Sequence, residues 1–261
     1  MRAPAAEGAI EHERRAPSPR LAPFVEHHWT VVWRGVDVPV VREVLPHPSV
    51  HIAFERGRSG IAGVPEGRFV RTLEGEGWVL GVKMRPGGFR PFVDHSIARL
   101  KNRVVPIDAV FGEGTTERTL ERMRAATSFA ARVEIVEALL EARLPEVDPR
   151  AVLAADIVRR VLEDASLQRV ADVAAAFGLS PRALQRLFTE YVGVSPKWVI
   201  LRYRLHEALE RMHAGEKVDH AALATELGFT DQAHFIRAFK ALVGRPPAAY
   251  ERSTTRDEAK R

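Results

Sequence analysis

The chain has 261 residues, 46% of them hydrophobic, which is enough material to bury cores in two domains. Its 39 Lys and Arg residues against 34 Asp and Glu give a formal net charge of +5, and so small an excess is weak evidence for a nucleic-acid partner. The absence of cysteine excludes disulfides, thiolate catalysis and cysteine-based zinc sites. No apolar run approaches the length of a membrane span, and the first residues lack the apolar core of a signal peptide, so neither feature is expected.

Residues 1–20 contain mostly Ala, Pro, Glu and Arg, and we expect them to form a mobile tail. Short β-rich segments separated by Gly and Pro clusters then predict a small antiparallel barrel or sandwich. The period becomes helical after residue 109, so residues 21–147 are expected to form a β-rich sensor or dimerisation domain with helices at its carboxyl end. The expected strands are 28–33, 42–45, 50–54, 69–73 and 78–84, and the expected helices are 116–123 and 129–144.

The β-rich region contains aromatic and histidine residues that a ligand site would use. Trp29, Trp78 and Phe89 are the candidates for a ligand pocket, with the alternative that all three belong to the core. His27 and His28 are adjacent and face opposite sides of a strand, while two prolines interrupt the segment that holds the other two histidines, His47 and His51. We therefore expect neither a metal site nor a cofactor.

The stretch from residue 167 to residue 250 contains one pattern twice. Each copy has a helical segment, a glycine, a polar residue that starts a second helix, and another glycine. Gly228 follows Gly178 by 50 residues and Gly244 follows Gly193 by 51, so the second copy has one extra residue in its turn. A tandem helix-turn-helix, in a helical domain over residues 148–252, predicts a DNA-binding protein with two recognition helices.

Local chemistry predicts where the second helix of each copy begins and which face it buries. Ser180 is a good N-cap with Pro181 at the first helical position, and in the second copy Thr230 is the expected cap, with Asp231 in the first turn. The apolar stripes at i, i+3, i+4 and i+7 indicate one buried face for each helix. These stripes are Leu184, Leu187, Phe188 and Tyr191, and Phe235, Ala238, Phe239 and Leu242.

The opposite faces carry residues that could contact DNA, although exposed Arg and Gln more often form an ordinary solvated surface. In the first copy these residues are Arg182, Gln185, Arg186 and Thr189, and their counterparts are Ala233, Ile236, Arg237 and Lys240. Gln232 and His234 add polar groups near the start of the second helix. Because the first copy offers more hydrogen-bonding groups to base edges, it is expected to supply most of the sequence discrimination.

This region resembles the AraC/XylS family of bacterial transcription regulators. The most specific part of the resemblance is the string from Gly228 to Lys240, followed by Gly244, Pro246 and Tyr250. The resemblance implies a seven-helix DNA-binding domain in which a long helix joins the two motifs. The segments 82–92 and 104–108 look, more loosely, like the cupin-like amino-terminal domain of some of these regulators, which implies a sensor or dimerisation role.

The joining helix is expected to run from Pro196 to Ala214 and to span about 28 Å, close to the roughly 34 Å of one DNA turn. The fold class is therefore α+β, with a β-rich domain, an all-α domain and a mobile tail over residues 253–261. No nucleophile elbow, phosphate-binding Gly loop or HExxH motif is present, and we do not expect an enzyme.

The expected function is sequence-specific transcription regulation in a bacterial cytoplasm, at the nucleoid, with double-stranded DNA as the partner and no membrane association. A small-molecule effector, RNA polymerase and a second copy of the chain remain open as partners. The alternative function is a helical protein-interaction module without specific DNA binding.

Overall fold

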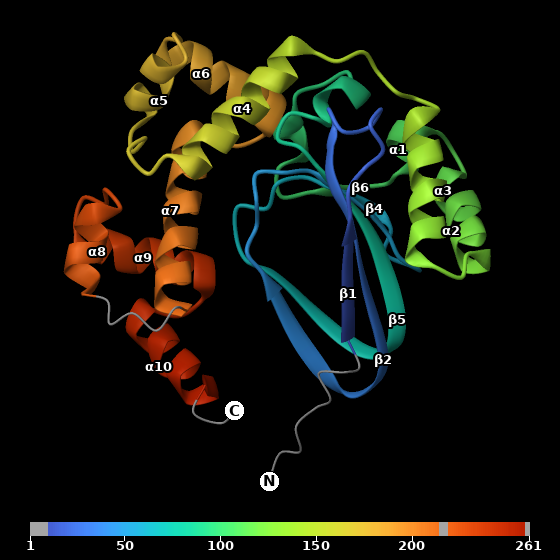
Figure 1. Ribbon diagram of the computed structural model, residues 1–261, viewed down its shortest axis with the longest axis horizontal. Coiled ribbons are helices and arrows are strands. Elements are labelled where there is room, and N and C mark those ends of the chain that lie inside the picture. The colour runs from blue at the N-terminus through green and yellow to red at the C-terminus, as the bar shows by residue number, and fades with distance from the viewer. Residues whose placement is uncertain (1–9, 214–218, 259–261) are drawn as a thin grey trace.

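The computed structural model describes residues 10–213 and 219–258. Figure 1 shows a β-sheet flanked by helices, and beside it an all-helical part that contains the carboxyl-terminal half of the chain. This arrangement confirms the expected order of a β-rich domain followed by a helical one. The strands form one antiparallel sheet in the order β1-β2-β5-β3-β4-β6. The strands are β1 Ile10–Arg15, β2 Val25–Val44, β3 His51–Phe54, β4 Gly60–Ala62, β5 Phe69–Met84 and β6 Val104–Val105.

Strand β1 corrects the prediction of a mobile tail over residues 1–20. Its residues pair with β2 in antiparallel register, from Ile10 opposite Trp33 to Arg15 opposite His28. The sequence of β1 is almost entirely charged or polar, and its side chains are mostly exposed. An edge strand of this kind is held by backbone hydrogen bonds to its neighbour, so its side chains carry no apolar pattern that would reveal it.

Strands β2 and β5 each join segments that the sequence suggested were separate. They pair along their length, from Val25 opposite Met84 to Val44 opposite Phe69, with register shifts around Val36. Gly35 and Gly75 have positive φ angles of 61° and 63° beside that irregularity. Glycine adopts such angles without steric penalty, so the strands continue through the bulge and bend, as Figure 1 shows.

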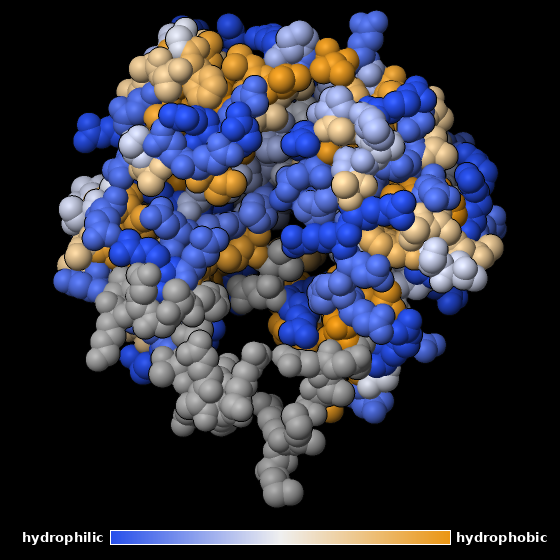
Figure 2. All heavy atoms as spheres, in the orientation of Figure 1, coloured by the Kyte–Doolittle hydropathy of each residue, from blue (hydrophilic) through white to orange (hydrophobic). Residues whose placement is uncertain are grey.

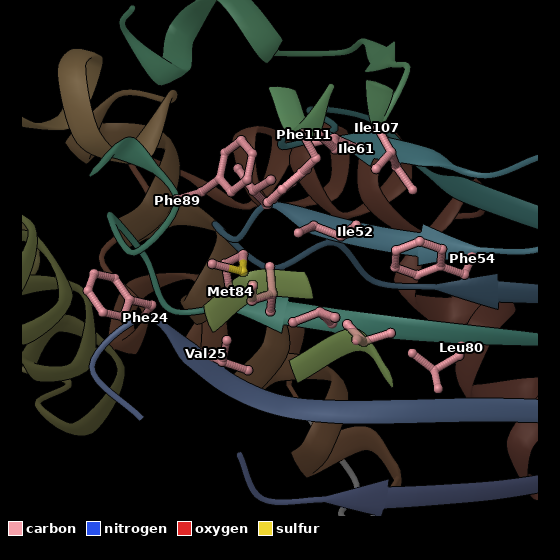
Figure 3. Packing of buried hydrophobic residues seen from close by; sticks show 14 of the residues in the cluster. Phe24, Val25, Ile52, Phe54, Ile61, Leu80, Met84, Phe89, Ile107 and Phe111 are labelled. Atoms are coloured by element: carbon pink, nitrogen blue, oxygen red, sulfur yellow. The ribbon is translucent and has the colours of Figure 1, made fainter. Parts of the chain in front are cut away.

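The two faces of the sheet bury different clusters. Alternate residues such as Leu80 and Val82 enter the main core, whereas Val79 and Trp33 belong to a smaller cluster on the other face. The main core is closed by helices that follow the sheet, and Figure 3 shows Phe89 and Phe111 pointing into it together with strand residues. The covering elements are η2 Arg90–Phe92, η3 Ile97–Leu100, α1 Asp108–Phe111, α2 Thr115–Ala125 and α3 Phe129–Glu141.

The helical part has two cores connected by one long helix. The first core lies among α4, α5, α6, η4 and the first part of α7, and the second lies among the rest of α7, α8, α9 and α10. Helix α10 continues through Glu258, so the prediction of a mobile tail from residue 253 is wrong. The expected end of the joining helix at Ala214 lies outside the described residues. The elements are α4 Pro149–Glu163, α5 Val170–Ala176, α6 Pro181–Leu187, η4 Phe188–Val192, α7 Pro196–His213, α8 His220–Glu226, α9 Gln232–Val243 and α10 Pro247–Glu258.

Loops of the sheet domain pack against both helical cores. Val64 is 1% exposed and belongs to the first helical core, while Leu45 packs against the second. Arg202 on α7 donates a hydrogen bond of 2.8 Å from Nη2 to the backbone oxygen of Glu66. A Cβ added at Gly87 would lie only 2.9 Å from the backbone oxygen of Ala151, so this turn approaches α4 closely. These contacts seat the helical domain on the sheet domain.

Candidate nucleic-acid interface

The first helix-turn-helix has the local chemistry that its sequence predicts. Gly178 lies between α5 and α6 with φ of 63°, a left-handed conformation that glycine adopts at little cost. The Oγ of Ser180 accepts a hydrogen bond of 3.2 Å from the backbone N–H of Ala183, and Pro181 opens α6. These features fix the angle at which the second helix leaves the turn.

Helix α6 and the π-helical turn η4 that continues it separate a buried face from an exposed one. Leu184 and Leu187 are 0% and 4% exposed, and the rest of the predicted stripe is buried as well. The predicted DNA-contacting residues Arg182, Gln185, Arg186 and Thr189 are all exposed. The Oγ1 of Thr189 donates to the backbone oxygen of Gln185 at 2.9 Å, which leaves the guanidinium groups of the two arginines as the most available donors on this face.

The second helix-turn-helix repeats this geometry with one correction. The cap of α9 is Asp231 rather than Thr230, and its Oδ1 accepts a hydrogen bond of 2.7 Å from the backbone N–H of His234. The offset of 51 residues that relates the two helices also relates Ser180 to Asp231, so the extra residue lies before the cap. A carboxylate at this position satisfies a free N–H and interacts favourably with the helix dipole.

The exposed face of α9 is less polar than that of α6. Gln232, Arg237 and Lys240 are exposed and His234 is half-buried, whereas Phe235 and Phe239 are fully buried. Ile236 is half-buried and packs against the second helical core, so it presents less surface than the sequence pattern suggested. Each motif thus presents basic and amide side chains, but those of the first lie closer together, between Arg182 and Arg186, than those of the second, between Gln232 and Lys240.

The sheet domain contacts the end of the first recognition helix directly. Ser96 Oγ donates a hydrogen bond of 2.7 Å to the backbone oxygen of Thr189. Arg90 Nε donates to a carboxylate oxygen of Glu190, also at 2.7 Å. Sequence reasoning missed both contacts, because the bonded residues lie about a hundred positions apart in the chain and no local pattern links them.

Helix α7 joins the two motifs. Its 18 residues span about 27 Å at about 1.5 Å per residue. Figure 1 shows α7 running between the α5–α6 pair and the α8–α9 pair. Arg211 near its end pairs with Glu226 of α8 at 2.7 Å, which ties the second motif to this rod. The length is close to the axial repeat of about 34 Å that separates successive major grooves on one face of DNA.

Histidines lie where the sheet domain meets α7. The rings of His47 and His206 are 4.9 Å apart between centroids in an edge-to-face arrangement. Burial, reinforced by the charge of Lys83 and by His206, lowers the pKa of His47 to about 3. Burial, with Arg202 and Lys83 nearby, lowers the pKa of His206 to about 4. Both imidazoles are therefore neutral at pH 7.

The structure does not bring the three ligand-pocket candidates together. Trp29 lies over Gly81 on the face of the sheet away from the main core, and its buried Nε1 lacks a hydrogen-bond partner among the described residues. Trp78 packs against the main core with the guanidinium carbon of Arg132 4.2 Å from its ring centroid. Phe89 is 1% exposed inside that core, as Figure 3 shows. The buried Nε1 of Trp29 is a donor that a ligand could use.

The described residues contain no group of three or more His, Asp or Glu side chains placed to hold a metal ion. Within the same residues, no helix combines the length and the apolar character needed to span a bilayer. Figure 2 shows hydrophilic and hydrophobic residues interleaved over the viewed face.

Comparison with known proteins assigns both parts of the chain. Residues 173–253 match the family model of a helix-turn-helix domain, and residues 13–106 match a domain of unknown function (DUF6597). The uncharacterized HTH-type transcriptional regulator YidL of Escherichia coli (strain K12) is 40% identical over 94 residues, which are 34% of this chain. The chain spans about a third of the length of that relative, since the match covers 31% of it.

Two solved structures show weaker likenesses. The carboxyl-terminal domain of AraT, a response regulator from Geobacillus stearothermophilus, is 26% identical, with a TM-score of 0.33 over 37% of this chain and 84% of that one. ToxT from Vibrio cholerae O395 is 13% identical, with a TM-score of 0.39 over 94% of this chain and 98% of that one.

The resemblance to known regulators lies in the helical domain. Its tandem motifs, its joining helix and the helix-turn-helix match agree with the signature from Gly228 to Tyr250. Helix-turn-helix domains of this kind bind DNA, and regulators that contain them are not normally enzymes. The carboxyl-terminal part of the chain therefore contains a helix-turn-helix domain that resembles those of AraC/XylS transcription regulators.

Proposed function

We propose that the protein is a sequence-specific DNA-binding transcription regulator whose helices α6 and α9 enter successive major grooves of one duplex. The observation that carries the proposal is the pair of matched, exposed helix faces, in which Arg186 and Arg237 recur 51 residues apart on helices joined by α7. Arginine forms paired hydrogen bonds with guanine in the major groove, which gives these positions a role in reading sequence.

The roles of the individual residues follow from their groups and positions. Arg182, Gln185 and Arg186 present hydrogen-bonding groups to base edges, and Thr189 lies at the end of the same face. Gln232, His234 and Arg237 are the polar groups of the second helix that face the groove, while Lys240 is placed for a phosphate. The alternative of a helical protein-interaction module predicts no affinity for DNA.

The sheet domain acts in this proposal as a sensor or dimerisation unit, over about residues 21–147, with the DNA-binding domain over residues 148–252. Trp29, with its unpartnered Nε1, is the residue we would test first for contact with a small-molecule effector. Such a regulator works at the nucleoid in the bacterial cytoplasm. RNA polymerase and a second copy of the chain are the further partners to measure, by co-purification and by sedimentation on DNA.

The experiment is a mobility-shift titration of the full chain on its own upstream DNA, with excess nonspecific DNA as competitor. We expect a retained complex whose affinity falls steeply as salt rises, because basic side chains displace counterions from phosphates. A matched titration with the Arg186→Ala, Arg237→Ala double variant tests whether the recurring arginines carry the effect. A complex that competitor removes entirely, or an affinity that is flat with salt, would contradict the proposal.

A further inference from the structure

A groove between α2 and α3 lies outside every site described above. Its volume is about 390 Å³, within the usual range for small-molecule pockets. Three arginines, Arg118, Arg122 and Arg143, belong to its lining, which contains no acidic residue. The groove also lies between the two segments matched by family models, so neither match assigns it a role.

The three arginines of the groove form no salt bridge among the described residues, although Asp108 lies close enough for the charge of Arg118 to help lower its pKa. Within the described residues, no carboxylate lies within ion-pair distance of these three guanidinium groups. Two nearby acids have other hydrogen-bond partners: Glu117 pairs with Arg124 at 3.2 Å, and Asp108 accepts hydrogen bonds from the backbone N–H and the hydroxyl of Thr116. Like charges gathered with little counter-charge raise the energy of the free protein, and an anion would relieve this.

The walls of the groove hold two of the arginines in place. Arg118 Nη2 donates to the hydroxyl of Thr115 at 3.2 Å, and Arg143 Nη1 donates to the backbone oxygen of Val110. A guanidinium has five N–H donors, so each arginine keeps several for a ligand. Thr115 is only 6% exposed, and Phe111 and Leu139 supply apolar surface beside it.

We propose that this groove binds a small molecule that carries an oxyanion, a carboxylate or a phosphate ester, on an apolar body. Arginine recognises both groups with paired, charge-assisted hydrogen bonds, and the apolar wall takes the body of the ligand. DNA is not the occupant, because Figure 1 places α2 and α3 on the opposite side of the sheet from α6 and α9. Binding here is independent of DNA binding, so its test stands apart from that of the proposed function.

The test is isothermal titration calorimetry of the full chain with 4-phenylbutyrate, phenyl phosphate and the neutral 4-phenylbutanol. We expect the two anions to bind and the alcohol not to bind, and the tighter anion identifies the preferred oxyanion. Replacing Arg118 and Arg122 together by Gln should weaken anion binding about tenfold or more, since each lost charged hydrogen bond corresponds to about that factor.

The matched control is Arg124→Gln, which lies on the same helix but pairs with Glu117 outside the groove, and its affinity should equal that of the unchanged protein. Arg122→Gln alone covers the case in which the double variant fails to fold, because Arg122 is exposed. The single variant should also bind the anions more weakly than the unchanged protein. Absence of anion binding at millimolar concentrations, equal affinity for the alcohol, or unchanged affinity in the groove variants would overturn the proposal.

Discussion

The sheet domain forms hydrogen bonds to the recognition helix of the first helix-turn-helix, whereas it reaches the second through Leu45 at the helical core and Arg68 beside Gly244. Ser96 and Arg90 bond to the end of the first recognition helix, and Val64 enters the core beneath it. The second motif is tied to α7 by Arg211 and to the start of the first motif by Gln168, whose Nε2 donates to the backbone oxygen of Glu226 at 2.8 Å. The same turn chemistry is therefore used in two different settings.

The two recognition helices also differ in their backbone conformation. The first recognition helix passes into a π-helical turn, closed by a hydrogen bond from the N–H of Gly193 to the oxygen of Phe188, while α9 continues as a regular α-helix to Val243. π-helical turns are frequent at functional sites. The repeat thus specifies two similar recognition helices. Their surroundings and their exposed residues differ, so we expect them to contribute unequally to DNA recognition. Each of the following predictions tests one part of this comparison.

The largest effect is expected from changing the spacing of the DNA half-sites. Inserting about half a helical turn between them should reduce affinity to that of a single half-site, because the second groove then faces away from α9. A mobility-shift titration measures this, with a spacer of altered sequence and unchanged length as the control. Equal affinity for the inserted and original sites would mean that α7 does not set the spacing.

Replacing a core phenylalanine should destabilise only the motif whose core contains it. Phe188 and Phe239 are 1% and 0% exposed and belong to different clusters, so replacing either by Ala should cost about 3–5 kcal/mol in its own core. Hydrogen exchange should show faster exchange in α5 and α6 for Phe188→Ala, and in α8 and α9 for Phe239→Ala. Equal loss of protection in both motifs for either variant would show that the two cores unfold together.

Arg186 and Lys240 test the division between sequence reading and general affinity. Arg186→Ala should cost about 1–3 kcal/mol and relax the preference at one base pair, while Lys240→Ala should weaken binding about equally on all sequences. Titrations on a panel of single-base variants of the site measure both effects. An unchanged base preference in Arg186→Ala would remove the assigned role of the first helix.

Ser96→Ala should have a smaller effect that is confined to the first motif. The variant loses the hydrogen bond to Thr189, which is worth about 0.5–1.5 kcal/mol. Ser96 and Ser128 each cap a helix of the sheet domain, η3 and α3, but Figure 1 shows α3 away from both motifs, so Ser128→Ala is the matched control. We expect weaker binding at the first half-site only, as measured by footprinting. Equal loss at both half-sites would contradict a local role for this contact.

The smallest effect at neutral pH concerns His206 of α7 and His47, which lies against it. Their pKa values fall from 6.5 to about 3 and about 4, so the folded protein disfavours the protonated rings. Their contribution to stability is present above pH 6.5 and is lost as pH falls toward those values. Melting temperatures followed from pH 7 to pH 4 should decline less steeply in His206→Gln than in the unchanged protein. An identical slope would show that His206 is not involved.

The sequence predicted the features that depend on local chemistry. Gly178 and Gly228 close helices with left-handed backbones, and Ser180 caps α6, because each requirement acts within a few residues. The candidate residues of α6 are exposed as the helical period required. The cap of α9 was misplaced by one residue because Thr230 and Asp231 are both good caps, and only the backbone geometry distinguishes them.

Features that depend on distant contacts could not be predicted. The charged strand β1 is defined by its backbone pairing with β2, and Ser96 reaches Thr189 through the tertiary packing of η3 on η4. Trp29, Trp78 and Phe89 appeared as one aromatic set, but the alternation of the sheet places Trp29 on the face opposite the main core, in which Trp78 and Phe89 both pack. A pattern along the chain identifies the face of an element, and tertiary packing determines what that face meets.

The central claim is that α7 joins two recognition helices with unequal sequence preference. The most direct test is selection of bound sequences from random DNA by the full chain. We predict two half-sites about one helical turn apart, with a stronger base preference in one half and loss of that preference in Arg186→Ala. Recovery of a single half-site, of two half-sites with variable spacing, or of no preferred sequence would contradict this account.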